Sequence, residues 1–236
     1  MKKLGIVLAS LMLGACGAGD GGNAGPTAAS AAGASTSKLI AIAAPAGRYQ
    51  VDPNHASLRF SVKHVGLADY HLSFTDYDMS IVLAPEKLAH SSVSLAIRPL
   101  SVRATYSGDY QATHKQSPFS SWEEALARSP KFLDADQHPE IVYESTAVEA
   151  LDDGRLQIDG NLSLRGQTHP VRLYAQLTGV YAEHPFTGKG ALGFSAQGEF
   201  SRSRFGMDHL VDKDIVSDRV VVQFDGEFHE TAPEGS

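Results

Sequence analysis

The feature that most constrains this chain is an alternation of apolar and polar side chains that recurs over many short segments. From Ser57 to Lys63, Leu58, Phe60 and Val62 are apolar and the residues between them are polar. The same alternation marks later segments: Tyr77 to Leu83, Val93 to Ile97, Ile141 to Tyr143, Leu156 to Leu164, Val171 to Leu177, Leu192 to Phe200 and Val220 to Phe228. Because successive side chains of a strand point to opposite faces, the pattern predicts antiparallel strands that each bury one face.

Three glycines, Gly160, Gly198 and Gly226, interrupt these segments at positions of the apolar face. Glycine inside a strand is typical of a bulge or a sharp bend, which a sheet needs in order to close on itself. We therefore expect an all-β barrel. A flat sandwich of two sheets is the alternative.

One segment breaks the alternation and predicts a short helix inserted between strands. Ser121 followed by Glu124 matches a capping box, Trp122 and Leu126 lie on one helical face, and Pro130 ends the run. The helix would either cover a sheet edge or gate the mouth of the barrel, and the sequence does not choose between these roles.

The N-terminal segment predicts export and a lipid anchor. Residues 1–15 combine two lysines with an apolar run too short to span a bilayer, and they precede Cys16 in a pattern that resembles the bacterial lipobox. Cys16 is the only cysteine, so no disulfide can form within the chain. We expect acylation of Cys16 and attachment to the periplasmic side of the envelope. The resemblance favours the outer membrane, because Gly17 stands where an inner-membrane retention signal usually has aspartate. A plain signal peptide with an incidental cysteine is the alternative.

Composition divides the rest of the chain. Residues 16–46 are rich in Gly, Ala and Ser and predict a flexible tether, 47–230 form one domain, and 231–236 are expected to be a disordered tail. The formal net charge of −7 argues against nucleic-acid binding, which requires clustered Lys and Arg.

No pattern in the sequence indicates catalysis or a metal ion. The ten histidines show no His-x-His or His-x-x-x-His spacing, and His55 and His64 would lie on opposite faces of one strand. Ser195 lacks the second glycine of a nucleophile elbow and lies within a predicted strand. We therefore expect no catalytic residue, no metal and no cofactor. A zinc site assembled from separate strands is left open.

Arg202 is out of place, because it continues the apolar face formed by Leu192, Phe194 and Phe200. A buried cation without a partner costs several kcal/mol. Three interpretations follow: a salt bridge with Asp52 or Asp218 that closes one barrel end, a contact with the head group of a ligand, or an exposed strand end. The salt bridge is the first to test.

Several pieces of the sequence resemble one family. They are YQVDPNHASLRFSVKHVG from Tyr49, KFLDADQHPEIVYEST from Lys131, GNLSLRGQTHPVRL from Gly160, GFSAQGEFSRSRFGM from Gly193 and VSDRVVVQFDGEF from Val216. In this order they resemble the YceI-like family of bacterial exported lipid-binding proteins. Asp52 and His55 match its Asp-x-x-His opening, and Arg202, Phe205 and Gly206 match its Arg-x-x-Phe-Gly stretch. Between Thr105 and Phe132 the chain departs from the family, because the Trp122 helix replaces a shorter passage.

The resemblance implies a lipocalin-like antiparallel barrel of about eight strands around an apolar cavity. The ligand would be a polyisoprenoid, an isoprenoid quinone or a fatty-acyl compound, held without turnover, since an apolar chain gains about 0.8 kcal/mol for each methylene removed from water. A homodimer is left open. A barrel enzyme acting on a lipid-like substrate and a structural or stress-related envelope lipoprotein are the alternatives.

Two groups of candidate residues follow for the cavity. Candidates for its polar ends are Asp52, His55, Arg202 and Asp218. Candidates for the lining of the ligand cavity are Leu58, Phe60, Val62, His64, Leu95, Ile97, Leu162, Leu164, Leu173, Phe194, Phe200, Val222 and Phe224.

Overall fold

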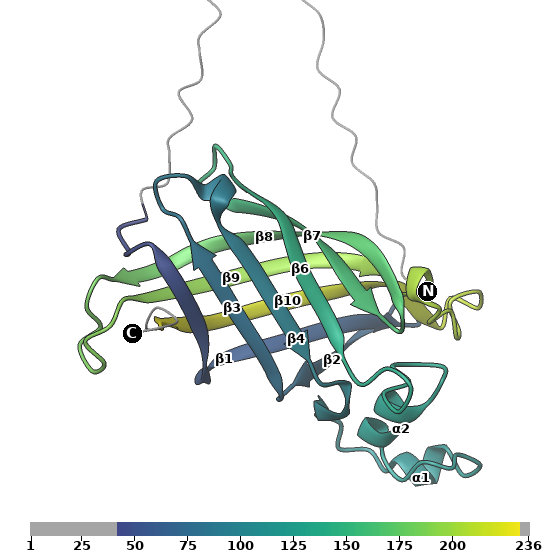
Figure 1. The fold of residues 1–236 in the computed structure, drawn as a ribbon. Helices are drawn as coiled ribbons and strands as arrows, with labels where there is room; N and C mark the ends of the chain where they lie inside the picture. The colour runs from purple at the N-terminus through teal and green to yellow at the C-terminus, as the bar shows by residue number, and fades with distance from the viewer. Residues whose placement is uncertain (1–41, 232–236) are drawn as a thin grey trace, which may run out of the picture. The chain divides into compact units, whose positions relative to one another are not determined.

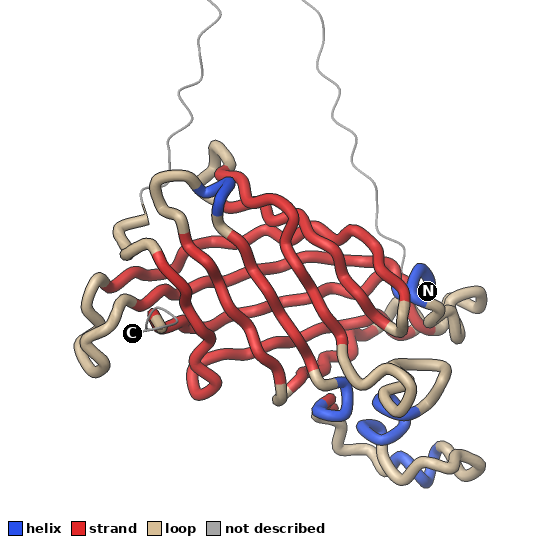
Figure 2. Tube along the Cα trace, in the orientation of Figure 1, coloured by secondary structure: helices blue, strands red, loops and turns tan. Residues whose placement is uncertain are grey.

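The computed structural model describes residues 42–231, which form mostly β-strands (Figures 1 and 2). The strands are β1 (Gly47–His64), β2 (Ala68–Phe74), β3 (Tyr77–Leu83), β4 (Ser92–Ile97), β5 (Val102–Ala104), β6 (Ile141–Ala150), β7 (Leu156–Leu164), β8 (Gln167–Tyr181), β9 (Ala191–Ser201) and β10 (Val216–Glu230). The helices are α1 (Tyr110–Thr113) and α2 (Trp122–Arg128), with the 3-10 turns η1 (Leu88–His90), η2 (Pro99–Ser101) and η3 (Arg202–Phe205).

Eight of the strands close into an antiparallel barrel. Their order is β10-β9-β8-β7-β6-β4-β3-β1, and β1 pairs back onto β10. The two further strands, β2 and β5, extend the wall, because β1 pairs with β3 through its first residues and with β2 through its second half. The expected all-β barrel of about eight strands is confirmed, and the two-sheet sandwich is excluded.

The inward glycines lie where the wall bends or packs most closely. The pairing register shifts beside Gly160, opposite Ser145, and beside Gly226, opposite Ala56. At Gly198 the register is regular, but a methyl group there would lie 2.5 Å from Cδ2 of Leu173. Two of the three glycines therefore accompany irregular pairing, and the third makes room for a neighbouring side chain.

The barrel has two different ends. The β8–β9 end carries the start of β1, the end of β10 and the β3–β4, β6–β7 and β8–β9 turns. The helix end carries the β1–β2 and β7–β8 turns, η3 and the start of β10. Figure 1 shows α1 and α2 at lower right and the β8–β9 turn at far left.

The predicted helix is present as α2, and its cap differs in one detail from the capping box. The Ser121 side chain accepts a hydrogen bond from the backbone N–H of Glu124 at 3.1 Å. The Glu124 carboxylate accepts from the backbone N–H of Ser120 rather than of Ser121, at 2.7 Å. The expectation of a single helix was incomplete, because Asp109 caps a second one, α1, by accepting from the N–H groups of Gln111 and Ala112.

The segment before β1 takes part in the packing of the barrel. Ile42 and Ala44, which fall within the predicted tether 16–46, are buried in the core. The predicted signal 1–15, Cys16 and almost all of the predicted tail 231–236 lie outside the described residues. Among the helices of residues 42–231, none is long and apolar enough to cross a membrane.

Candidate functional site

The apolar lining candidates all face the interior of the barrel, because their strands keep the period of two that the sequence shows. Six are buried in the core: Leu58, Ile97, Leu162, Leu164, Phe194 and Phe224. Seven keep part of their surface accessible: Phe60, Val62, His64, Leu95, Leu173, Phe200 and Val222. The interior is therefore filled unevenly.

The accessible interior side chains form a belt across four neighbouring strands. Phe60 on β1 pairs with Val222 on β10, Val222 pairs with Gly198 on β9, and Gly198 pairs with Leu173 on β8. The pairing turns Phe60, Val222 and Leu173 inward, yet each is only partly buried. These side chains pack against the buried core on one side, and their accessible surface is what an inward face that contacts a ligand would show.

The β8–β9 end, in contrast, is sealed by large side chains. Val51, Phe228 and Leu192 are neighbours on β1, β10 and β9, and Phe228 is 0% exposed. Tyr49, also 0% exposed, donates its hydroxyl to the carbonyl of Pro45 at 2.8 Å. Burial, reinforced by Glu230, raises the pKa of Tyr49 to about 12. A ligand could therefore reach the interior only from the rest of the barrel.

The wall is interrupted at the helix end. β6 pairs with β4 and β7, whereas β5 pairs only with β2, so no ladder joins β5 to β6. The segment between them contains α1 and α2, and α2 packs on β5 and η2. Glu123 accepts a hydrogen bond from the backbone N–H of Ala104 at 3.1 Å and so satisfies the free edge of β5. The insertion covers a sheet edge, one of the two roles expected for it.

An aromatic cluster joins the insertion to the barrel. The rings of His64 and Tyr70 stack with centroids 5.1 Å apart, and Tyr106 packs on Tyr70 at 4.7 Å. Trp122 lies edge-on to Tyr110 at 4.9 Å and to His114 at 4.7 Å. Tyr106, Tyr110 and Trp122 help to line a hollow of about 190 Å³. His64, the last inward residue of β1, is thus part of this cluster.

Arg202 is buried without a carboxylate partner, which corrects the expected salt bridge. Its side chain is held by four backbone carbonyls: Nε donates to Ser217 at 2.8 Å, Nη1 to Met207 at 2.6 Å, and Nη2 to His209 at 2.8 Å and Val216 at 2.9 Å. Arg202 is 4% exposed, and burial lowers its pKa from the usual arginine value. The guanidinium therefore fastens η3 to the start of β10.

The two carboxylates expected near Arg202 have other roles. Asp218 accepts hydrogen bonds from the backbone N–H and the hydroxyl of Ser203, at 2.7 and 3.0 Å. Burial opposes its ionisation, but these hydrogen bonds outweigh burial and lower its pKa. Asp52 lies near the far end of β10, and the 13 residue-to-residue steps from Val216 to His229 span about 43 Å at about 3.3 Å per step. The four polar candidates are thus split between opposite ends.

At the β8–β9 end, Asp52 and His55 form a local pair. The carboxylate Oδ2 of Asp52 lies 2.8 Å from Nδ1 of His55, and Oδ1 accepts from the backbone N–H of Asn54 at 2.9 Å. The hydrogen bond to His55 is the largest influence that lowers the pKa of Asp52, and it also raises the pKa of His55. The pair lies on the outside of the barrel wall, away from the accessible belt.

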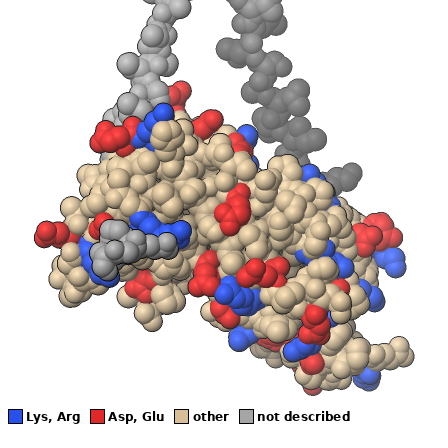
Figure 3. Space-filling model, in the orientation of Figure 1, with Lys and Arg blue, Asp and Glu red and all other residues tan. Residues whose placement is uncertain are grey.

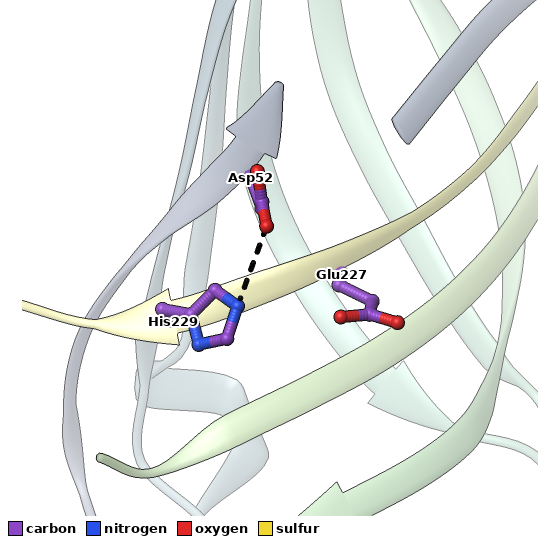
Figure 4. A group of neighbouring side chains, drawn as sticks. All are labelled: Asp52, Glu227 and His229. Carbon is purple, nitrogen blue, oxygen red and sulfur yellow. Dashed lines mark ion pairs between the residues drawn. The ribbon is translucent and has the colours of Figure 1, made fainter. Parts of the chain in front are cut away.

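Two residues near this pair were missed by the sequence reasoning. Glu227 and His229 lie on one face of β10 near Asp52, with one ligand atom of each residue within 4.8 Å of the others; Figure 4 shows the His229 ring next to Asp52. The sequence signal that could have found them is their Glu-x-His spacing, because residues two apart on a strand lie on the same face. The sequence did not reveal their proximity to Asp52, because that depends on the pairing of the first strand with the last.

The outer surface shows no concentration of one charge in the view of Figure 3, where acidic and basic side chains are interspersed. On β7 and β8, for example, Arg172 pairs with Asp159 at 2.6 Å. A hollow of about 340 Å³ next to this pair opens on the outer side of the wall. Exposed pairs of this kind contribute little to stability.

Comparison with known proteins agrees with the barrel. Residues 49–228 match the family described as the YceI-like domain. Protein YceI of Shigella flexneri is 30% identical over 164 residues, which cover 69% of this chain and 77% of that protein. A UPF0312 protein of Vibrio cholerae is 28% identical over 170 residues, which cover 71% of this chain and 82% of that protein.

Solved structures show the same fold at lower identity. The crystal structure of Burkholderia cenocepacia BcnA has a TM-score of 0.59 and 18% identity, over 77% of this chain and 99% of that one. The Campylobacter jejuni YceI protein also has a TM-score of 0.59, with 22% identity over 72% of this chain and 90% of that one.

Proposed function

The chain belongs to the YceI-like family, and from this premise we propose that its barrel binds a long apolar molecule non-covalently and without turnover. Three ligand classes fit: a polyisoprenoid, an isoprenoid quinone or a fatty-acyl compound. The observation that carries the proposal is the belt of Phe60, Val222 and Leu173, whose inward side chains stay partly accessible. Each methylene that such a chain buries contributes about 0.8 kcal/mol, so few polar contacts are needed.

The route of entry that we propose runs through the helix end. The β8–β9 end is closed by Tyr49, Leu192 and Phe228, whereas the wall lacks a ladder between β5 and β6. The insertion with α1 and α2 covers this gap, and movement of α2 away from β5 would expose the interior. Trp122 links the cover to the barrel, because its ring lies edge-on to Tyr106 at 6.5 Å and Tyr106 packs on Tyr70 of β2.

We also propose that the protein acts at the periplasmic face of the envelope. Cleavage after residue 15 and acylation of Cys16 would fasten it to the outer membrane. Several acyl chains together provide stable anchoring, whereas a single chain binds only marginally. Anchoring would keep the barrel close to membranes that contain its ligand.

Filling the accessible belt tests the binding proposal. Val222→Trp adds a large inward side chain, and Gln223→Trp adds the same side chain to the exposed outer face of β10. Titration with a fluorescent long-chain fatty acid should show that Val222→Trp weakens binding by at least about tenfold. Gln223→Trp should leave the affinity unchanged. If a ligand occupies the space beside the belt, Val222→Trp should cost less than the 1–3 kcal/mol that is typical of overpacking a filled core, about 1 kcal/mol at most.

Equal affinity in the two variants, or no binding by the wild type, would remove the support for a lipid-binding interior. A loss of more than about 3 kcal/mol in Val222→Trp would show that the belt is densely packed, as a purely structural barrel requires.

A further inference from the structure

The seam where the first and last strands close the barrel is irregular near the β8–β9 end. Val51 pairs with Phe228, but the next paired residue of β1 is Ala56, opposite Gly226. Four residues of β1, 52–55, therefore cross a single residue of β10, Glu227, outside the regular ladder. The seam lacks its usual backbone hydrogen bonds at this point.

Side chains that can bind a metal ion gather at this irregularity. Asp52 comes from the bulged segment, and Glu227 and His229 come from the outer face of β10 (Figure 4). Each residue offers one ligand atom, and these three atoms all lie within 4.8 Å of one another. Nε2 of His229 is 3.6 Å from Oδ2 of Asp52. Ligand atoms around a tetrahedral zinc ion lie about 3.2–3.6 Å apart, given bonds of about 2.0–2.2 Å.

The imidazole of His229 forms no hydrogen bond with any side chain or backbone group of residues 42–231. Its Nδ1 is buried without a hydrogen bond, and the 3.6 Å from Nε2 to Asp52 is too long for one. The ring of His184 packs edge-on against it at 5.1 Å, which fixes its orientation. His229 is 19% exposed and Asp52 16% exposed. A half-buried imidazole that faces two carboxylates without a hydrogen bond is arranged for a cation.

No lysine or arginine of the described chain forms an ion pair with Asp52 or Glu227, so a bound cation would neutralise both. His55 can add a fourth ligand, because its Nδ1 already lies 2.8 Å from Asp52 and its side chain, 63% exposed, is free to shift. Mixed imidazole and carboxylate ligands favour zinc or a similar first-row divalent ion over magnesium or calcium, which prefer oxygen alone.

We propose that Asp52, Glu227 and His229, with His55 as the fourth ligand, form a zinc site that fastens β1 to β10 across the irregular part of the seam. The ion would replace a missing part of the strand ladder with coordination bonds. This site lies on the outer wall, so the proposal does not depend on lipid binding in the interior.

The test uses the full chain after removal of metal with a chelator. Calorimetric titration should show one zinc ion per chain and much weaker binding of Mg²⁺ and Ca²⁺. At 100 times the dissociation constant, zinc should raise the melting temperature by about 5–10 °C. His229→Ala and the isosteric Glu227→Gln should each weaken binding by more than about tenfold, whereas His71→Ala, which removes an exposed histidine of β2, should not.

Binding that His229→Ala and Glu227→Gln leave unchanged would place the ion elsewhere and overturn the proposal. So would the absence of a zinc-dependent shift in melting temperature, or binding of Mg²⁺ as tight as that of zinc. Glu227→Gln keeps the result interpretable if His229→Ala fails to fold, because Glu227 is exposed and its replacement keeps its shape.

Discussion

The two parts of the barrel interior differ in how completely they are filled, although both are lined by apolar side chains from the same strands. At the β8–β9 end, Tyr49, Leu192 and Phe228 are at most 1% exposed. Nearer the helix end, Phe60 and Val222 point inward and remain partly accessible. Alternation of apolar residues thus defines an inward face, but not whether protein or ligand fills the space next to it.

The largest expected effect comes from truncating the sealed end. Phe228→Ala should destabilise the protein by about 3–5 kcal/mol, because it removes a fully buried ring and leaves a cavity. Phe60→Ala should cost clearly less, about 1–2 kcal/mol, because its ring is already partly accessible and keeps mainly its stacking on Phe74 at 5.0 Å. Urea denaturation of both variants measures the difference. Equal losses would mean that the two parts are packed alike.

A second prediction concerns the polar fastening of the helix end. Arg202→Met keeps much of the side-chain length but leaves the carbonyls of Ser217, Met207, His209 and Val216 without their donor. Unsatisfied buried groups cost about 1–3 kcal/mol each when water cannot reach them, and partial hydration should reduce the total loss to about 2–4 kcal/mol. Arg204→Met changes an exposed neighbour and should have little effect. Thermal unfolding compares the two variants, and an Arg202→Met protein as stable as wild type would contradict the structural role.

Trp122 tests whether the helix end opens for the ligand. Trp122→Ala removes the ring that contacts Tyr110 and His114, and should cost about 1–2 kcal/mol because the ring is only partly buried. Ligand dissociation, followed by stopped-flow fluorescence, should become several times faster. Phe186→Ala, at an exposed site of the β8–β9 turn, serves as the control and should change neither quantity. An unchanged dissociation rate in Trp122→Ala would exclude the proposed entry route.

The smallest effect is expected from the hydroxyl of Tyr49. At pH 8, Tyr49→Phe loses the hydrogen bond to Pro45 and should cost about 0.5–1.5 kcal/mol. Folding raises the pKa of Tyr49 from 10.0 to about 12, so its stabilising contribution is present below pH 10 and is lost as the pH rises toward 12.

Wild-type stability should therefore fall more steeply above pH 10 than that of Tyr49→Phe, which cannot ionise at this position. Tyr181→Phe, which changes a tyrosine that is 54% exposed, should keep the wild-type slope. Urea denaturation between pH 8 and 11 measures all three proteins. Identical slopes for wild type and Tyr49→Phe would show that Tyr49 is not protected by burial.

The sequence predicted the barrel well because the alternation around Leu58, Phe60 and Val62 is a direct consequence of strand geometry. It also predicted α2, since Ser121 and Pro130 are local signals. The partner of Arg202 could not be predicted in this way. Backbone carbonyls are offered by every residue, so the four that hold its guanidinium are selected by the path of the chain from Met207 to Ser217.

The polar group at the β8–β9 end shows the same limit. Asp52 and His55 lie three residues apart, and their contact follows from the local bulge. Glu227 and His229 join them only because β10 pairs with β1 across the 151 residues that separate the two strands, and nothing local indicates that pairing. The sequence marks the bulge only by a change of parity, from Tyr49 and Val51 before it to Leu58 and Phe60 after it, and this change does not tell which residues are extra.

The most direct test of the central claim is mass spectrometry of the full chain, purified from its native host without added lipid. The account predicts one long apolar molecule per barrel, observed on the intact protein and released by organic solvent, and its absence from Val222→Trp. A wild-type protein that is folded, free of any such molecule and unable to take one up from lipid vesicles would contradict it.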